Sequence, residues 1–266
     1  HGRCRQRSRL PALTRLLGDP EPNVRAAVLK QLAESPSMSM VPKVSEFVDK
    51  ETDPDLIVHA VRFFREAKGA ASLETLTKLL KHESWRVRAE AAEAIGKSVS
   101  NRYGGFANSS MPAEAMATAY AGLIELLDDG DGFVVSRAIG SLKGVDMVEV
   151  VDPVLRSIER HPELAGPAVE VLTSGPQMTV KTFTRLQELS LHDDPAVRVA
   201  AIKGLCAANF GDVSGDIKRA LGDSESTVRV EALKQLLSML ENGKPSDESP
   251  RAAVVPMQRI GPLESF

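Results

Sequence analysis

The 266-residue sequence predicts an all-α fold, an α-solenoid of about seven helix-turn-helix units. A ten-residue segment recurs along the chain, its copies are spaced almost evenly, and its apolar residues follow a helical period. Aromatic residues make up only 4% of the sequence, which is low for a β-sandwich and typical of an all-helical chain. The pattern requires no strand.

Five copies of the recurring segment are clear and two are weaker. Each copy is anchored on its first apolar residue, and the anchors are Val24, Leu56, Val87, Val134, Leu164, Val197 and Val228. Successive anchors lie 30 to 33 residues apart, except for one gap of 47 residues between Val87 and Val134. In the first copy, Val24, Val28 and Leu32 are spaced four residues apart, which places them on one face of a helix.

A second helical pattern and a short polar break precede each copy. The pattern before the third copy, for example, carries Leu76, Leu79 and Leu80. The breaks, such as GDPEP and HDDP, contain Asp and Pro, which stop one helix and cap or start the next. One helix pair cannot bury its own apolar face, so we expect the pairs to stack in a row, with alanines allowing close approach.

The pattern D-x-x-x-x-V-R-x-x-A-x-x-x-L resembles that of HEAT repeats, in particular the short bacterial kind also called PBS-lyase HEAT-like repeats. Asp19 with Val24-Arg25 and Asp223 with Val228-Arg229 match it best. The resemblance covers roughly residues 9 to 241. It implies an armadillo-like superhelix of helix pairs.

The resemblance also implies a ladder of ion pairs, because in this family the arginine commonly pairs with an aspartate of an adjacent unit. The residues that would form this structural ladder are Arg25, Arg88, Arg198, Arg229, Asp19 and Asp223. In the fourth copy Asp129 keeps the acidic position, but Val135 replaces the arginine. Copies two and five lack both charges, so we expect the ladder to be interrupted at those units.

The composition of the chain predicts three regions. Residues 1–9 form a basic leader, residues 10–241 form the repeat solenoid with an insertion near 100–112, and residues 242–266 form a proline-containing tail. The first residue is His, so we expect the chain to be a fragment or a processed form. Because terminal repeats need cover, we expect the tail or a downstream domain to cover the seventh repeat.

The sequence shows no arrangement of residues typical of catalysis, metal binding or cofactor binding. No two of the five histidines have the i, i+4 spacing of a helical metal site, and DDGDG at 128–132 lacks the final glutamate of a calcium loop. The chain also has no Gly-rich phosphate loop or nucleophile elbow. Cys4 and Cys206 are too few for a disulfide framework, and we expect Cys206 to be a core residue.

These observations predict a non-catalytic, monomeric scaffold that binds a protein or a peptide. One alternative is a lyase-like enzyme of the PBS-lyase HEAT type, and another is a nucleic-acid-binding HEAT-like solenoid. Nucleic acid is disfavoured because the net charge is -3 and the charges expected on the exposed helix faces are of mixed sign. No apolar run is long enough to span a bilayer. The composition fits the cytoplasm and a bacterial extracytoplasmic space equally well.

The predicted insertion and one second helix supply the candidate partner-binding residues. In the insertion they are Arg102, Tyr103 and Phe106, because Tyr and Arg are frequent anchors at protein interfaces. The alternative is that the two rings only pin the loop onto adjacent helices. On the helix they are His59 and Arg62, which occupy positions expected to be exposed.

Overall fold

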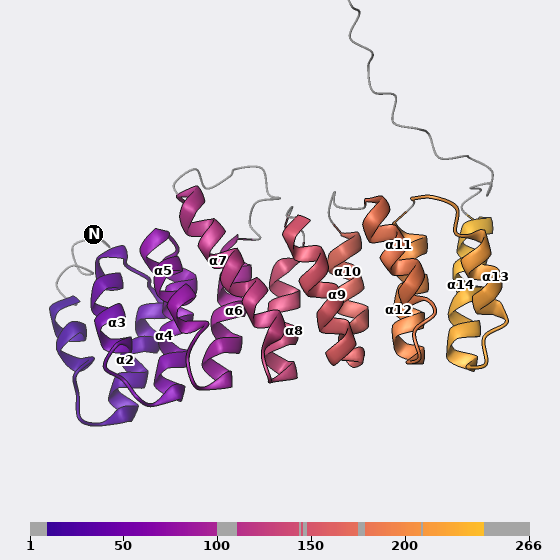
Figure 1. The fold of residues 1–266 in the computed structure, drawn as a ribbon. Coiled ribbons are helices and arrows are strands. Elements are labelled where there is room, and N and C mark those ends of the chain that lie inside the picture. The colour runs from indigo at the N-terminus through magenta and orange to yellow at the C-terminus, as the bar shows by residue number, and fades with distance from the viewer. Residues whose placement is uncertain are drawn as a thin grey trace, which may run out of the picture. The chain divides into compact units, whose positions relative to one another are not determined.

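The structure is a computed structural model, and it describes residues 10–99, 111–143, 145, 148–174, 179–208 and 210–241. All regular elements within these ranges are helices, so the predicted all-α repeat fold is confirmed. The chain divides into two compact units, residues His1–Gln177 and Met178–Phe266. The boundary between the two units lies at the break before the sixth repeat. Each unit is described by itself below (Figure 1).

The first unit contains five of the expected helix pairs. Residues 10–16 are helical and precede α2 (Pro22–Glu34). The next pairs are α3 (Val41–Val48) with α4 (Pro54–Ala67), α5 (Ala70–Leu79) with α6 (Trp85–Val99), α7 (Ala113–Glu125) with α8 (Gly132–Leu142), and α9 (Val151–Arg160) with α10 (Ala165–Thr173). The second helices α2, α4, α6, α8 and α10 pack successively against one another, while α3, α5 and α7 form a parallel row of first helices (Figure 1).

The second unit contains two further pairs. They are α11 (Val180–Leu189) with α12 (Pro195–Ala207), and α13 (Ser214–Leu221) with α14 (Ser226–Glu241). As in the first unit, the second helices α12 and α14 pack directly against each other. The same packing rule therefore holds in both units.

Residues of the polar breaks start the second helices. The carboxylates of Asp53, Asp131 and Asp194 each accept a hydrogen bond from a backbone N–H of the first turn of α4, α8 and α12. These bonds satisfy amide groups that have no partner inside the helix. Proline stands within the first two positions of α2, α4 and α12, where its fixed φ favours a helix start.

Small residues allow α6 and α8 to approach closely. A Cβ atom added to Gly96 of α6 would lie 2.8 Å from the Cα of Ser141 of α8. The Ser141 hydroxyl donates to the carbonyl oxygen of Ala92 across this contact, at 2.8 Å. Ala91 of α6 is also fully buried. The alanine-rich pattern thus corresponds to a tightly packed helix interface.

The predicted leader, most of the insertion and the tail, residues 1–9, 100–110 and 242–266, lie outside the described residues. The described part resumes at Met111, and α7 begins at Ala113 directly after Pro112, as expected for a proline at a helix start. Within the described ranges, no helix combines the length and the apolarity needed to cross a bilayer.

Candidate functional site

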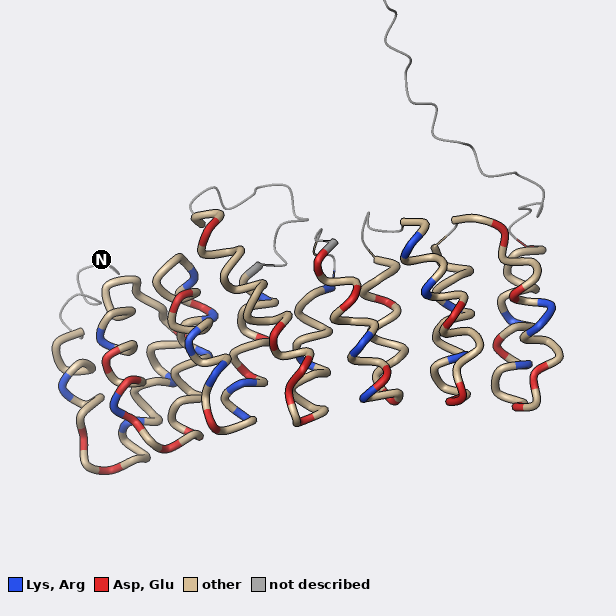
Figure 2. Tube along the Cα trace, viewed as in Figure 1, with Lys and Arg blue, Asp and Glu red and all other residues tan. Residues whose placement is uncertain are grey.

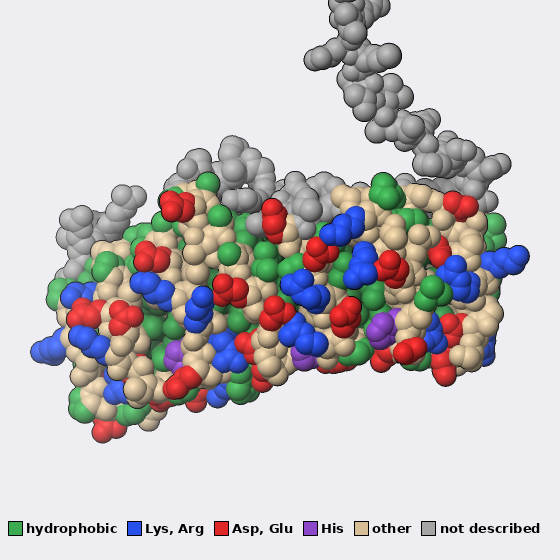
Figure 3. Space-filling model, in the orientation of Figure 1, with side chains coloured by type: hydrophobic (Ala, Val, Ile, Leu, Met, Phe, Trp, Pro, Cys, Tyr) green, Lys and Arg blue, Asp and Glu red, His purple; other side chains and the backbone are tan. Residues whose placement is uncertain are grey.

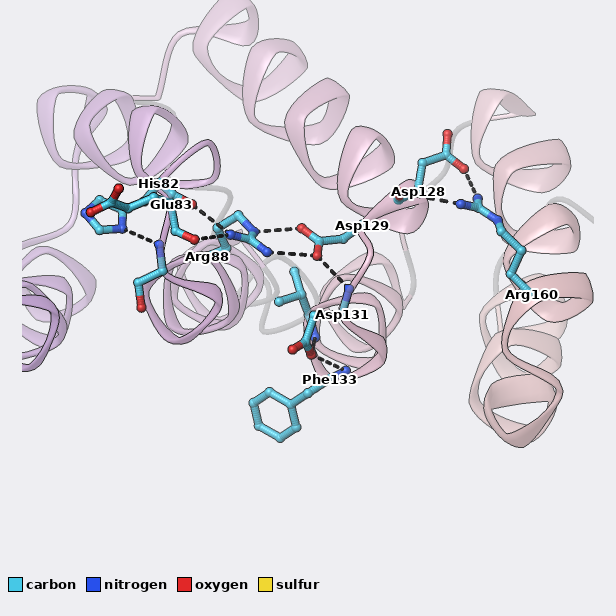
Figure 4. Close-up of polar contacts among 10 residues, drawn as sticks. His82, Glu83, Arg88, Asp128, Asp129, Asp131, Phe133 and Arg160 are labelled. Carbon is cyan, nitrogen blue, oxygen red and sulfur yellow. Dashed lines mark hydrogen bonds and ion pairs between the residues drawn. The ribbon is translucent and has the colours of Figure 1, made fainter.

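Arg88 of α6 joins the third and fourth repeats through two sets of hydrogen bonds. Its Nη1 donates to the carbonyl oxygens of His82 and Glu83, in the turn before its own helix, at 2.9 and 2.8 Å. Its Nε and Nη2 donate to Oδ2 and Oδ1 of Asp129, in the turn of the next repeat, at 2.7 and 2.9 Å (Figure 4). Such a bidentate arginine–carboxylate pair fixes both distance and orientation between its partners.

Arg198 of α12 makes the same arrangement in the second unit. Its Nη1 donates to the carbonyl oxygens of His192 and Asp193, at 2.8 and 2.9 Å. Its Nε and Nη2 bind the two carboxylate oxygens of Asp223 in the following turn, at 2.9 and 2.8 Å. The two units therefore use one device to join consecutive repeats.

We call each ion pair that joins two consecutive repeats of the ladder a rung. The first rung uses a glutamate in place of the expected aspartate. Arg25 donates to the carbonyl oxygens of Asp19 and Pro20 in its own turn, and its Nε binds Oε2 of Glu51 at 3.1 Å. The second repeat therefore accepts a rung, although the sequence pattern predicted an interruption there. The interruption lies on the other side of that repeat, where buried Ile57 replaces the arginine.

Two of the predicted ladder residues, Asp19 and Arg229, form no rung with any residue in the ranges that the structure describes. The carboxylate of Asp19 accepts from the backbone N–H of Glu21 within its own turn, because no earlier described repeat supplies an arginine. Arg229 donates to the carbonyl oxygens of Asp223 and Ser224, and in the part of the chain that the structure describes no carboxylate forms an ion pair with it. Among the described residues, both side chains therefore hold their own turns.

The acidic residue of each rung also holds its own turn together. Asp129 accepts from the backbone N–H of Asp131 at 2.9 Å, and Asp223 accepts from that of Glu225 at 2.9 Å. In the third and sixth repeats the corresponding residue is a histidine. There Nδ1 of His82 and of His192 accepts the same backbone hydrogen bond, each at 3.0 Å. A histidine thus preserves the turn without supplying a carboxylate for a rung.

The fourth and fifth repeats are joined in the opposite direction. Val135 stands where the first, third, sixth and seventh repeats carry the ladder arginine, and it is buried. Arg160 at the end of α9 instead pairs with the carboxylate of Asp128 (Figure 4). Its Nη2 also donates to the carbonyl oxygen of Leu127, at 3.4 Å. The cation is therefore supplied by the later repeat at this junction.

Electrostatics favour the ionised form of the rung carboxylates. Hydrogen bonding from Arg198 lowers the pKa of Asp223 below its ordinary value of 3.8, and the backbone N–H of Glu225 acts in the same direction. Burial acts to raise the pKa of Asp129, but hydrogen bonds from Arg88 and from the backbone of Asp131 outweigh it, so this pKa is also lowered. These groups are satisfied by one another and stabilise the junctions between repeats.

The predicted partner-binding residues fall into two groups. Arg102, Tyr103 and Phe106 lie outside the described residues. His59 and Arg62 both belong to α4, where Arg62 is exposed and His59 is half-buried. Burial of the imidazole, reinforced by the charge of Arg62, lowers the pKa of His59. The neutral form of His59 therefore predominates at pH 7.

An exposed aromatic pair, absent from the sequence prediction, lies at the adjacent starts of α6 and α8. The side chains of Trp85 and Phe133 are 44% and 48% exposed. Their ring centroids are 5.6 Å apart with planes at 82°, an edge-to-face arrangement. Figure 4 shows the Phe133 ring pointing away from the ladder and its hydrogen bonds. The pair is thus available on the surface while the ladder is occupied.

A groove of about 450 Å³ adjoins this aromatic pair. It is lined by Glu93, Gly96, Lys97, Phe133, Ser136, Arg137, Gly140, Ser141 and Lys143, and we call it the α6–α8 groove. Gly140 lines the groove without a side chain, whereas Gly96 packs against Ser141. Nothing lies within 4 Å of a Cβ atom added to Gly140. The groove is therefore open to solvent along one side.

The groove carries more positive than negative charge. The Arg137 guanidinium lies 4.8 Å from the centre of the Phe133 ring, a cation–π contact, and also pairs with Glu93. Lys97 pairs with the same Glu93 carboxylate, so one acid serves two cations. The hydrogen bond from Lys97 lowers the pKa of Glu93, burial opposes this, and the charge of Arg137 adds to it.

One feature of the sequence marks this surface. Trp85 occupies the first position of α6, where α2, α4 and α12 begin with proline, and it is the only tryptophan in the chain. A large aromatic side chain is not required to start a helix. A tryptophan at a position where other second helices carry proline could therefore have marked Trp85 as a candidate binding residue. The repeat pattern did not, because it does not include this position.

Chemically reactive groups are sparse in the described residues. No group of three or more His, Cys, Asp and Glu side chains in these ranges could hold a metal ion. Burial raises the pKa of the Cys206 thiol to about 11. Acidic and basic side chains are interspersed along the helices of each unit rather than separated into tracks (Figures 2 and 3).

Comparisons with known proteins identify the repeats. The pattern of HEAT repeats matches residues 41–143, and that of the single HEAT repeat matches residues 10–34. No curated protein is significantly similar to the chain in sequence.

Several solved structures resemble the chain at low sequence identity. A complex of CpcE and CpcF of phycocyanin lyase from Nostoc sp. is 16% identical, with 88% of this chain and 89% of that one covered and a TM-score of 0.48. Human deoxyhypusine hydroxylase with glycerol is 16% identical, with coverages of 91% and 99% and a TM-score of 0.39. An engineered protein is 20% identical, with coverages of 87% and 96% and a TM-score of 0.38.

The matched patterns are those of HEAT repeats in general. They agree with the stacked helix pairs that each unit shows by itself, and residues 10–34 and 41–143 match HEAT repeats.

Proposed function

We propose that this chain is a non-catalytic scaffold that binds a protein or peptide partner through the α6–α8 groove and the aromatic pair beside it. The observation that carries the proposal is the edge-to-face contact of Trp85 and Phe133, two large rings that stay about half exposed at one end of the groove. Tryptophan and arginine are enriched among the residues that dominate binding energy at protein interfaces, and Arg137 lies directly beside the rings.

The groove defines the chemistry of the partner. An apolar or aromatic side chain of the partner would pack on Trp85 and Phe133, because these rings offer the largest apolar area there. A carboxylate of the partner would pair with Lys97 and Arg137, which share the single carboxylate of Glu93. An extended peptide with an apolar residue followed by an acidic one therefore fits the surface best.

The single tryptophan allows a direct test of this proposal. Peptides are selected from a random display library against the folded protein, and each selected peptide is titrated while the emission of Trp85 is recorded. We expect the emission to shift to shorter wavelength, because a bound peptide excludes water from the ring. We also expect enrichment of peptides that combine apolar and acidic residues.

Variants then locate the binding surface. Phe133→Ala and Arg137→Ala should each weaken binding by roughly tenfold or more, the effect of losing more than 1.4 kcal/mol at a contact. The matched control is Leu191→Ala, which removes another exposed apolar side chain far from the groove in sequence. Binding that survives both groove variants but is lost with the control would refute the proposal.

A further inference from the structure

The last helix of the described chain exposes a row of apolar side chains. Val230, Leu233, Leu237 and Leu240 of α14 are between 48% and 69% exposed. Their spacings of three, four and three residues place them on one face of the helix. Four large apolar side chains in one contiguous row indicate a surface that is covered by something else. We call these four residues the α14 row.

The residues at the same positions in the other second helices show which face of α14 carries the α14 row. Five other second helices are followed by a further second helix in the same unit. In each of them the residue that corresponds to Leu233 is at most 1% exposed. These residues are Leu29, Val61, Ala92, Ile139 and Ile202. In α6 the contact is explicit. Ser141 of α8 donates to the carbonyl oxygen of Ala92, and it lies against Gly96, which corresponds to Leu237. The α14 row is therefore the face on which the next element packs.

The sequence that follows α14 has two parts of different composition. Residues 242–252, NGKPSDESPRA, are polar and rich in proline and serine. Residues 253–266 contain six large apolar residues, which are Val254, Val255, Met257, Ile260, Leu263 and Phe266, and only two charged ones. A polar connector followed by an apolar segment is expected for a tethered segment that packs on a nearby surface.

We propose that residues 253–266 pack along the α14 row and so cover the end of the seventh repeat. The row extends over ten residue steps, which is about 15 Å of helix. An extended connector of eleven residues spans up to roughly 36 Å, so it reaches back past the whole row. The fourteen residues of the apolar segment are then long enough to lie along every side chain of the row.

A second copy of the chain is a weaker occupant of the same row. Four side chains on one helix bury far less than the roughly 1,200 Å² at which stable protein interfaces begin. The segment of the same chain is tethered by a short connector, and its effective concentration at the row is on the order of millimolar. The tether favours the chain's own segment over a free copy.

The test is hydrogen–deuterium exchange of the whole chain, with sedimentation to establish its oligomeric state. We expect the amides of 253–266 to exchange at least about tenfold more slowly than those of the connector 242–252, because packed segments are protected. Paired substitutions Leu233→Asp and Leu237→Asp should abolish this protection. The tail substitutions Met257→Asp and Ile260→Asp should do the same without altering any described helix.

A matched control separates loss of the contact from a general effect of charge. Val180→Asp places a carboxylate at another exposed apolar position of the same unit, 71% exposed on α11, and should leave the tail protected. Rapid exchange of 253–266 in the unmodified monomer overturns the proposal. A concentration-dependent dimer with a rapidly exchanging tail assigns the row to a second copy and overturns it equally.

Discussion

Arg88 and Asp129 join two consecutive repeats through a bidentate contact, with Nε to Oδ2 at 2.7 Å and Nη2 to Oδ1 at 2.9 Å. The remaining Nη1 of the same guanidinium holds the two carbonyl oxygens of its own turn. One side chain therefore fixes a turn and a junction at the same time. Arg198 repeats this arrangement with Asp223, which shows that it belongs to the repeat and not to one local site.

The first prediction separates the two roles of the ladder arginine. Arg88→Ala should lower the free energy of unfolding by about 1–3 kcal/mol, because it leaves the part-buried carboxylate of Asp129 without its partner. Arg229→Ala is the matched control, since Arg229 makes the same turn contacts and no described rung. The Arg229→Ala variant should lose clearly less free energy of unfolding than Arg88→Ala, as measured by denaturant unfolding followed by circular dichroism. Equal losses in the two variants would show that the rung adds nothing.

The second prediction concerns acid. The pKa values of Asp129 and Asp223 are lowered in the folded state from their ordinary value of 3.8. Their contribution to stability is therefore present above this value and is lost as the pH falls through the lowered folded pKa. Stability should decline as the pH drops below about 4. Asp129→Asn should flatten this decline, whereas the exposed control Asp49→Asn should not; an unchanged acid profile in Asp129→Asn contradicts the account.

The third prediction tests the close contact of α6 and α8 with two glycines. Gly96→Ala should destabilise the protein by about 1–3 kcal/mol, because its Cβ would lie 2.6 to 2.8 Å from three atoms of Ser141. Gly140→Ala should stabilise it by about 0.5–1 kcal/mol, since this position is helical and has open space around it. Thermal unfolding of the two variants measures both. A neutral Gly96→Ala would mean that the helices are farther apart than described.

The fourth prediction concerns the thiol of Cys206. Because burial raises its pKa to about 11, roughly one thiol in a thousand is ionised at pH 8. In a Cys4→Ser background, Cys206 should react with a disulfide reagent at least about 100-fold more slowly than a free cysteine does. The same protein should react fully in denaturant. Rapid reaction of the folded protein would place the thiol at the surface.

The repeat architecture could be predicted from sequence because it depends on features that recur. The helical period recurs in every repeat, the anchors are evenly spaced except for one longer gap, and Asp or Pro stands in every break but the third. Individual rungs were harder to predict. Glu51 accepts from Arg25 although it does not match the aspartate of the pattern, since a glutamate in the same turn reaches the same guanidinium.

The surface was least predictable, because no repeat pattern encodes it. Trp85 and Phe133 are 48 residues apart in the sequence and become neighbours only because α6 and α8 pack side by side across the longer gap. The α14 row looks like any other buried helix face in the sequence. Its exposure follows only from the absence of a further second helix in the described residues.

The measurement that tests the central claim most directly is the exchange footprint of a bound peptide. A selected peptide is added at saturation, and hydrogen–deuterium exchange is compared with and without it. The account predicts slower exchange at the start of α6 around Trp85 and along α8 from Phe133 to Lys143, with α14 unchanged. Protection confined to other helices, with α6 and α8 exchanging as before, would contradict the assignment of the α6–α8 groove as the binding surface.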